Sequence, residues 1–172
     1  MKAHWPGPLT LILPRREGVA RASAAGQASS GLRCPSHPVA QALLRAARAL
    51  GVRGVSGPSA NRFGRVSPTR SEHVVSEFGP ELDVLDGGAC AVGIESTIID
   101  CSRGQPVLLR PGMLDVATLS RTAGLEIWTP AQAALALGKA TPRASGTLDS
   151  HYAPNARVRL LSVAEMEQAA QG

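Results

Sequence analysis

The chain of 172 residues is long enough for one ordinary domain with an extension and can bury a core. Its 44% hydrophobic and 18% charged residues are typical of globular rather than disordered proteins. No apolar run reaches the roughly 18 residues of a membrane span, and the first residues lack the apolar core of a signal peptide. We therefore expect a cytoplasmic protein with no membrane partner.

Arginine carries almost all of the positive charge. Lys2 and Lys139 are the only lysines, and the formal net charge is +5. A planar guanidinium suits carboxylates and phosphates, so the charge favours an anionic small molecule or a nucleic acid as partner. The alternative is an arginine-rich coding bias that leaves these side chains on solvent-facing surfaces. Aromatic residues make up only 3% of the chain, which leaves few platforms for stacking single-stranded bases.

The three cysteines, Cys34, Cys90 and Cys101, lie far apart in the sequence. None belongs to a Cys-x-x-Cys pair, which argues against a zinc site or a disulfide framework. We expect reduced thiols that serve as small buried hydrophobic groups, and no protein-bound metal.

The first half of the chain alternates apolar runs with breaks. An apolar run between two prolines predicts a buried strand over 9–13. A small-residue, arginine-rich surface loop is expected over 15–30, and a short strand over 31–34. Apolar residues at three- to four-residue spacing predict a helix over 38–50, with proline in its first turn and glycine after it. A strand over 52–56 follows.

A second helix is expected to begin near Thr69, where Thr69 and Glu72 have the spacing of a capping box. Gly79 is placed to close that helix in a left-handed conformation. Further on, β-rich runs over 97–100 and 107–109 flank a polar tetrapeptide and predict a hairpin.

The last third of the chain begins with a predicted short helix over 115–122. Residues 129–150 are rich in alanine, proline, threonine, glycine and serine, and we interpret them as a linker. A strand over 158–161 and a helix cap over 162–165 then suggest the start of another domain. Strands alternating with helices and a hairpin indicate an α/β fold with a mixed sheet.

Polar side chains follow the predicted strand over 52–56. Ser59 and Asn61 supply a hydroxyl and an amide beside Gly57, where a ligand could approach the backbone closely. Ser67 lies just before a predicted helix amino terminus, which suits an anionic group such as a phosphate. The alternative is a helix cap followed by an ordinary turn.

Two arginines stand at the ends of predicted strands. Arg33 lies in an apolar setting and needs an acceptor, either a structural carboxylate or the carboxylate of a ligand. Arg110 is either a phosphate clamp or a solvated edge arginine. Between them, Glu95-Ser96-Thr97 places a carboxylate beside two hydroxyls. Because no Gly-x-Ser-x-Gly elbow is present, we expect these groups to orient a polar substrate rather than attack it.

Taken together, six motifs occur in the order seen in YrdC-like threonylcarbamoyl-adenylate synthases. They are Trp5-Pro6-Gly7-Pro8-Leu9-Thr10, Leu32-Arg33-Cys34-Pro35 with His37-Pro38, Gly57-Pro58-Ser59-Ala60-Asn61, Ser67-Pro68-Thr69, Glu95-Ser96-Thr97 and Leu109-Arg110-Pro111-Gly112. A Ser-His-Tyr-Ala-Pro segment at 150–154 is similar to the linker of the long, two-domain members. The resemblance covers residues 4–156.

This resemblance implies a twisted mixed α/β sheet with flanking helices around a concave cavity. It also implies a nucleotidyltransferase that forms L-threonylcarbamoyl-AMP from ATP, L-threonine and bicarbonate and releases pyrophosphate. Mg²⁺ would accompany ATP without being held by the protein, and no protein nucleophile would be needed, because positioning and charge neutralisation do the work. Partner proteins would then pass the threonylcarbamoyl group to tRNA. Double-stranded RNA is a further candidate partner.

The resemblance also assigns roles to single residues. The expected threonine contacts are Arg33, which would hold the carboxylate, Gly57 and Ser96. The expected ATP contacts are Ser29, Ser59, Asn61 in a supporting role, Ser67, Arg110 and Tyr152, which would close over the nucleotide from the linker.

The domain boundaries follow from the same match. We expect the carboxyl-side part of the catalytic domain over 1–128, a linker over 129–156 and the start of a second domain over 157–172. The family's Pro-Thr strand and Lys-x-Arg phosphate motif are not found before Trp5. On this basis we expect a fragment truncated at both ends that is weakly active or inactive alone. The rival interpretations are an RNA-binding module and a non-catalytic remnant that serves as an interaction surface.

Overall fold

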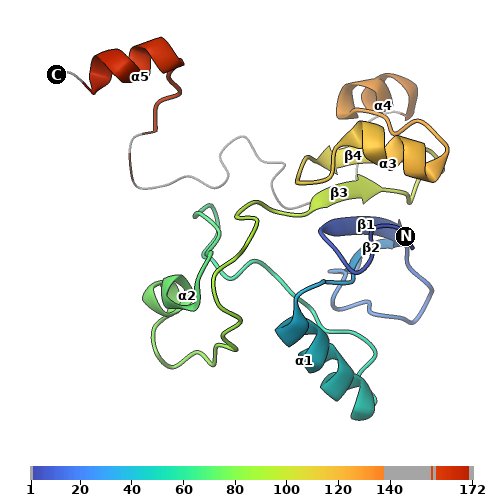
Figure 1. The fold of residues 1–172 in the computed structure, drawn as a ribbon. Coiled ribbons are helices and arrows are strands. Elements are labelled where there is room, and N and C mark those ends of the chain that lie inside the picture. Colours follow the sequence, from blue (N-terminus) through green and yellow to red (C-terminus); the bar gives the residue numbers. More distant parts are fainter. Residues whose placement is uncertain (1, 138–155, 157, 171–172) are drawn as a thin grey trace.

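A computed structural model describes residues 2–137, 156 and 158–170. None of the helices in these ranges is long and apolar enough to cross a membrane. In chain order, the elements are β1 (Leu9–Pro14), β2 (Ser29–Arg33), α1 (Pro38–Ala49), α2 (Ser71–Phe78), β3 (Thr97–Asp100), β4 (Val107–Arg110), α3 (Val116–Ala123), α4 (Pro130–Leu137) and α5 (Val163–Ala169) (Figure 1).

The four strands form one sheet in the order β2-β1-β3-β4. β1 pairs with β2 in antiparallel and with β3 in parallel orientation, and β3 and β4 form the predicted antiparallel hairpin. The expected α/β fold with a mixed sheet is therefore confirmed. The parallel pair places β1 beside β3, although 82 residues separate the end of one strand from the start of the other (97 − 14 − 1).

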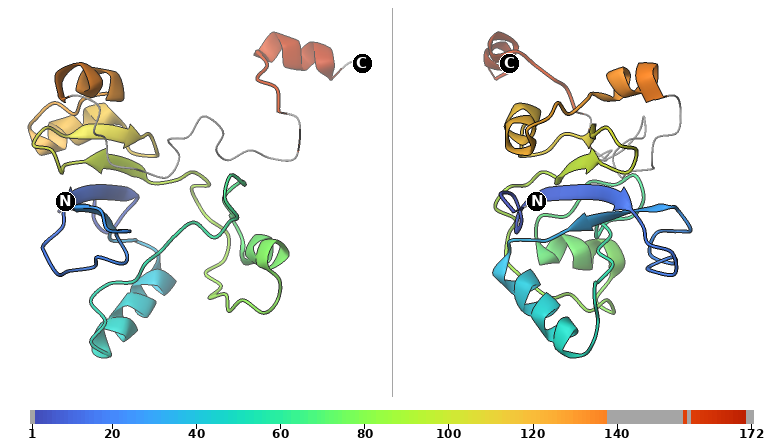
Figure 2. Two further views of the ribbon diagram at one scale, coloured as in Figure 1. Left: turned by 180° about the vertical axis from the view of Figure 1, so that it is seen from behind. Right: turned by 90° about the vertical axis from the view of Figure 1, so that its right-hand side faces the viewer.

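One face of the sheet packs against α3. Leu9 of β1 and Ile99 of β3 form a buried cluster with Leu119 of α3 and with Ile127. Burying such side chains contributes roughly 1.5–3 kcal/mol each relative to leaving them in water. α1 lies on the opposite side of the strands from α3 (Figures 1 and 2). The cluster under α3 therefore occupies one face of the sheet, whereas the other face combines buried apolar residues such as Ile12 and Ile98 with polar groups.

A β-bulge interrupts the register between β3 and β4. Asp100 pairs with Val107 and Ile99 with Leu108, but Ile98 pairs with Arg110, so Leu109 is the extra residue. Because side chains alternate between the two faces of a strand, one extra residue moves the side chains of the following residues to the opposite face. The bulge thus turns Arg110 to the face of Ile98, away from α3.

Three helices agree with the sequence-based expectations. α1 begins with proline in its first turn and is followed by Gly51 at φ 82°. α3 begins after Asp115, whose carboxylate accepts a 2.8 Å hydrogen bond from the Thr118 amide, and ends at Gly124 in the left-handed conformation. The Thr118 amide and hydroxyl hold the pKa of Asp115 below its usual value. α5 carries a reciprocal capping box between Ser162 and Glu165.

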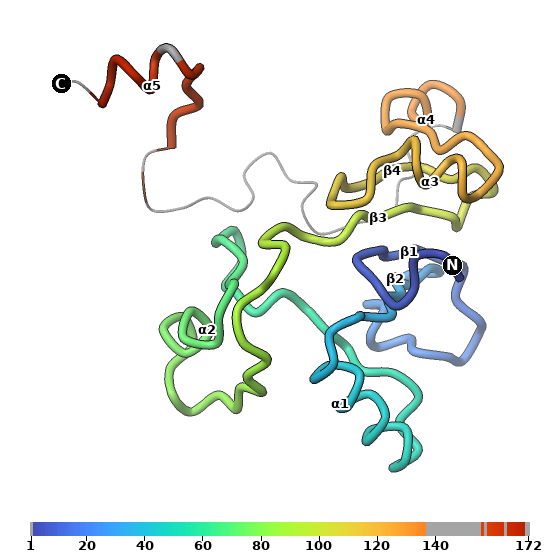
Figure 3. The backbone as a smooth tube through the Cα atoms, in the orientation of Figure 1, coloured from blue at the N-terminus to red at the C-terminus, as the bar shows by residue number. Residues whose placement is uncertain are grey.

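Other local predictions were wrong. Residues 52–56 are exposed and form no strand, since none of the strands in the described part of the chain pairs with them. Figure 3 shows their place in a long, mostly irregular course between α1 and β3, interrupted by α2. Residues 158–161 form no strand either. The predicted linker begins with a helix, α4, in which Ala133 is buried.

The capping box predicted at the start of the second helix does not form. α2 begins after Arg70, which makes no side-chain cap hydrogen bond. The backbone of Thr69 makes two other hydrogen bonds. Its carbonyl oxygen accepts from the Cys90 amide at 2.8 Å, and its amide donates to His73 Nδ1 at 3.3 Å. Gly79 ends the helix at φ 91° and ψ 169°, a positive φ but not the predicted left-handed helical conformation.

The thiols are only partly as expected. Cys34, Cys90 and Cys101 form no disulfide among the described residues, and Cys34 and Cys101 are half-buried. Cys90, however, is exposed rather than buried.

We predict that Gly112→Ala destabilises the fold. An added Cβ would lie 2.5 Å from the Thr97 nitrogen and 2.6 Å from the Glu95 carbonyl oxygen, both of which are backbone atoms that cannot rotate away. Such overpacking costs about 1–3 kcal/mol. Thermal unfolding followed by circular dichroism should show a lower midpoint. Gly54→Ala is the matched control, because a Cβ there meets no atom within 4 Å. Equal midpoints for the two variants would contradict the prediction.

Candidate functional site

A cavity of about 490 Å³ lies on the face of the sheet opposite α3. The sheet forms its floor, α1 forms one wall, and the irregular chain around Gly57 forms another. Its lining residues are Thr10, Gly31, Arg33, Pro35, Ala40, Leu43, Leu44, Val55, Gly57, Pro58, Ser59, Glu95, Ser96, Ile98 and Arg110.

Five of the residues that the family resemblance assigns to the site meet in this cavity. They are Arg33, Gly57, Ser59, Ser96 and Arg110. The strand register aligns one residue from each strand in a row across the floor of the cavity: Arg33, Thr10, Ile98 and Arg110. Three of these four side chains are polar. The two arginines stand three strand spacings apart, or about 14 Å between Cα atoms. A ligand of that length could contact both guanidinium groups.

Arg110 is the more buried of the two arginines, with only 9% of its surface exposed. Its Nε donates to the Ser96 carbonyl oxygen at 3.1 Å, and its Nη2 donates to the Ser96 hydroxyl at 3.1 Å. The Glu95 carboxylate lies 3.5 Å from the same nitrogen. The interpretation of Arg110 as a solvated edge arginine was therefore wrong.

Arg33 is held more loosely. It is exposed to solvent at the cavity, and its Nε donates to the Gly7 carbonyl oxygen at 3.2 Å. The alternative of a structural carboxylate partner is not realised, since the ion pairs found among the described residues do not include Arg33. Its guanidinium is thus placed by one backbone contact and faces the cavity.

A hydroxyl pair connects the centre of the floor to Arg110. Ser96 Oγ lies 2.7 Å from the hydroxyl oxygen of Thr10. Ser96 already accepts a hydrogen bond from Arg110, so its own proton is directed to Thr10 or to a ligand. Either arrangement leaves one hydroxyl proton of the pair for an acceptor on a ligand. The sequence analysis gave Thr10 no role in the site, although Thr10 is the last residue of the first motif, Trp5-Pro6-Gly7-Pro8-Leu9-Thr10.

Glu95, one of the groups that the sequence analysis expected to orient a substrate, also lines the cavity. Ser67 donates a 2.7 Å hydrogen bond to Glu95 Oε1, and the side-chain amide oxygen of Asn61, Oδ1, lies 3.5 Å from the same hydroxyl. The Asn61 amide nitrogen donates to the Arg62 and Arg65 carbonyls and so closes its own loop. Asn61 and Ser67 do not line the cavity themselves. Glu95 lines the cavity and contacts Ser67, which in turn lies beside Asn61.

Two predicted residues remain, Ser29 and Tyr152. Ser29 is at the far end of β2, paired with Pro14, and is not among the residues that line the cavity. Tyr152 lies outside the described residues. The described ranges contain no group of three or more histidine, cysteine, aspartate or glutamate side chains that could hold a metal ion.

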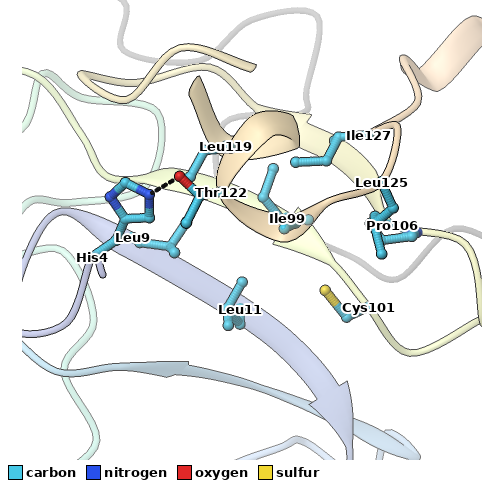
Figure 4. A pocket seen from close by; sticks show the side chains of 11 residues that line it. His4, Leu9, Leu11, Ile99, Cys101, Pro106, Leu119, Thr122, Leu125 and Ile127 are labelled. Atoms are coloured by element: carbon cyan, nitrogen blue, oxygen red, sulfur yellow. Dashed lines mark hydrogen bonds between the residues drawn. The ribbon is translucent and has the colours of Figure 1, made fainter. Parts of the chain in front are cut away.

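A second, apolar cavity of about 230 Å³ lies on the other face, beneath α3 (Figure 4). Leu9, Leu11 and Ile99 project into it, and His4 and Thr122 form a 3.1 Å hydrogen bond at its rim. Burial, together with the Asp100 carboxylate, raises the pKa of the Cys101 thiol in its wall. The thiol therefore stays protonated, and this cavity lacks the charged groups of the first one.

Family comparisons divide the chain into two parts. A Sua5/YciO/YrdC family model, described as "Telomere recombination", matches residues 1–112. A second model, described as "Threonylcarbamoyl-AMP synthase, C-terminal domain", matches residues 113–171.

Several curated proteins are similar to the chain. Threonylcarbamoyl-AMP synthase of Pyrococcus abyssi is 39% identical over 160 residues, which is 91% of this chain and 45% of that protein. The enzymes of that name from Schizosaccharomyces pombe and Bacillus subtilis are each 36% identical, over 93% and 91% of this chain and 40% and 44% of those proteins. The chain thus spans less than half the length of these relatives.

Solved structures agree with the sequence comparisons. The crystal structure of P. abyssi Sua5 complexed with L-threonine matches 92% of this chain and 42% of its own, with a TM-score of 0.68 and 37% identity. The structure of Escherichia coli YciO matches 69% of this chain and 56% of its own, with a TM-score of 0.57 and 29% identity.

We predict that Arg110→Gln lowers the stability of the fold. The shorter amide cannot reproduce the two hydrogen bonds to Ser96, and leaving buried acceptors unpaired costs about 1–3 kcal/mol. Urea unfolding should show a lower midpoint. Arg45→Gln, on the exposed side of α1, removes the same charge and should leave the midpoint nearly unchanged. A similar shift in both variants would mean that net charge, rather than this contact, sets the effect.

Proposed function

The chain belongs to the Sua5/YciO/YrdC family, and on that premise we propose that it forms L-threonylcarbamoyl-AMP from L-threonine, bicarbonate and ATP. The arrangement that supports this most directly is the single cavity that contains both arginines, Arg33 and Arg110, with the Ser96 hydroxyl between them. Threonine has a carboxylate and ATP has phosphates, so two cationic anchors within reach of one another suit two such substrates that react together.

In this proposal threonine occupies the Arg33 side of the cavity. The exposed guanidinium holds the threonine carboxylate through a charge-assisted hydrogen bond. Ser96 and the backbone at Gly57, where a Cβ would meet no atom within 4 Å, leave room for the amine and the hydroxyl. The P. abyssi relative whose structure contains L-threonine supports this choice of substrate.

ATP occupies the side of the cavity that contains Ser59 and Arg110, with Asn61 and Ser67 in support. Bicarbonate and the threonine amine combine to a carbamate with loss of water. A carbamate oxygen attacks the α-phosphorus, and the bond to the bridging oxygen breaks as pyrophosphate leaves. The protein contributes positioning and charge neutralisation rather than a nucleophile.

Mg²⁺ would accompany the phosphates. Among the described cavity residues, Glu95 is the only carboxylate, which fits a metal that is held mainly by phosphate oxygens and water. The adenylate is an activated acyl donor. Its threonylcarbamoyl group would pass to an adenosine of tRNA with the help of partner proteins.

We predict that Arg33→Gln weakens threonine binding about tenfold or more, because a charge-assisted hydrogen bond to the carboxylate is lost. Isothermal titration calorimetry with L-threonine measures this directly and requires no turnover. ATP affinity should change much less. Arg53→Gln, at an exposed position on the irregular chain after α1, is the matched control.

The outcome separates two kinds of failure. Unchanged threonine affinity in the Arg33 variant would remove the assigned role of Arg33. A wild-type chain that binds neither threonine nor ATP would refute the proposed function for this polypeptide.

A further inference from the structure

Thr10 lines the floor of the cavity, although the family resemblance gives it no role. It stands directly opposite Arg33 in the antiparallel pairing of β1 with β2. The Cβ atoms of two residues opposed in this way lie about 4.5–5.5 Å apart on the same face of the sheet. Thr10 therefore lies beside the arginine that is proposed to hold the threonine carboxylate.

The two branches of the Thr10 side chain face different strands. A Cβ added at Gly31 of β2 would lie 3.6 Å from the Thr10 methyl carbon, whereas the Thr10 hydroxyl oxygen lies 2.7 Å from Ser96 Oγ, just before β3. Because a β-branched side chain is stiff about χ1, this arrangement holds the hydroxyl in place. Among the described residues, Ser96 is the one hydrogen-bond partner of that hydroxyl.

Arg110, Ser96 and Thr10 form a short chain of polar groups across the floor. Arg110 can only donate, and its Nη2 donates to Ser96 Oγ at 3.1 Å. A hydroxyl that accepts from a cation becomes a stronger donor, so the favoured direction has Ser96 donating onward to Thr10. The Thr10 proton then has no acceptor in the described part of the chain, and Thr10 lies in the cavity beside Arg33.

The acceptor for this proton follows from the groups of the proposed substrate. Threonine has two kinds of acceptor, its carboxylate and its side-chain hydroxyl, whereas its ammonium group has no lone pair. Arg33 takes the carboxylate in the proposed function, which leaves the side-chain hydroxyl for Thr10.

We propose that Thr10 is a specificity-determining residue that donates to the side-chain hydroxyl of threonine and thereby selects threonine over valine. Valine has nearly the same shape but lacks this oxygen, so it leaves the Thr10 proton unpaired. A site built to hydrogen-bond a substrate hydroxyl discriminates against the analogue without it. The inference rests on the proposed function and adds how that site selects its amino acid.

The test compares three amino acids on the wild-type chain and on Thr10→Val, which keeps the β-branched shape and removes the hydroxyl. The affinities of L-threonine, L-valine and L-serine are measured by calorimetry, which requires no turnover. We expect the wild type to bind threonine about tenfold more tightly than valine. Thr10→Val should weaken threonine and serine by a similar factor and should not weaken valine, so the preference for threonine over valine is lost.

Two further variants serve as controls. Thr10→Ser keeps the hydroxyl and should retain the preference for threonine over valine. Thr122→Val removes a hydroxyl from α3, which lies at the apolar cavity on the other face, and should leave all three affinities at their wild-type values. A purely structural role of Thr10 would instead weaken the three amino acids equally and lower the thermal unfolding midpoint.

Three results would overturn the inference. The wild type could bind valine as tightly as threonine, Thr10→Val could retain the preference for threonine, or Thr10→Val could weaken threonine and valine by the same factor. A wild-type chain that bound none of the three amino acids would remove the proposed function and this inference with it. Wild-type preference for threonine with an unaffected Thr10→Val variant would refute the role of Thr10 alone.

Discussion

Arg110 is more than nine-tenths buried, and a guanidinium removed from water must keep its hydrogen bonds. The bulge at Leu109 makes this compatible with a four-stranded sheet, because it moves Arg110 from the face covered by α3 to the face of Ile98. There the guanidinium reaches the backbone and hydroxyl of Ser96. Gly112 then lets the chain after β4 lie directly on the backbone of 95–97, which carries both partners of Arg110.

Side chains alternate between the two faces of each strand, and this alternation separates the packing of the core from the lining of the cavity. Leu9 and Ile99 point toward α3 and form the core, while Thr10 and Ile98 point the other way and form the cavity floor. Neighbouring residues of one strand thus serve stability and ligand contact in turn. A shift of register by one residue would exchange the two faces, so the packing under α3 also secures the geometry of the cavity.

Sequence reasoning located the elements whose signals are local. The apolar period of α1, the short helix predicted over 115–122 and the hairpin of β3 and β4 depend on residues close in sequence, and all three form. The strand predicted at 52–56 failed because a strand needs a partner, and the apolar pattern of a segment does not show whether a partner lies beside it. The capping box at Thr69 failed because His73 and Cys90 compete for the same backbone groups.

For the site, the sequence by itself determined which chemical groups are present, since the order of six motifs pointed to the family and to both arginines. It did not reveal that Thr10 belongs with them, nor that Ser29 lies away from the cavity. The tertiary structure alone decided those points. Hydrogen-bond partners such as Ser67 and Glu95 are 28 residues apart, and Thr10 and Ser96 are 86 apart. Both contacts depend on the folded course of the chain, and the second follows from the pairing of β1 with β3. The direction in which a hydroxyl presents its proton is set by its neighbours in space, and these are known only once the chain has folded.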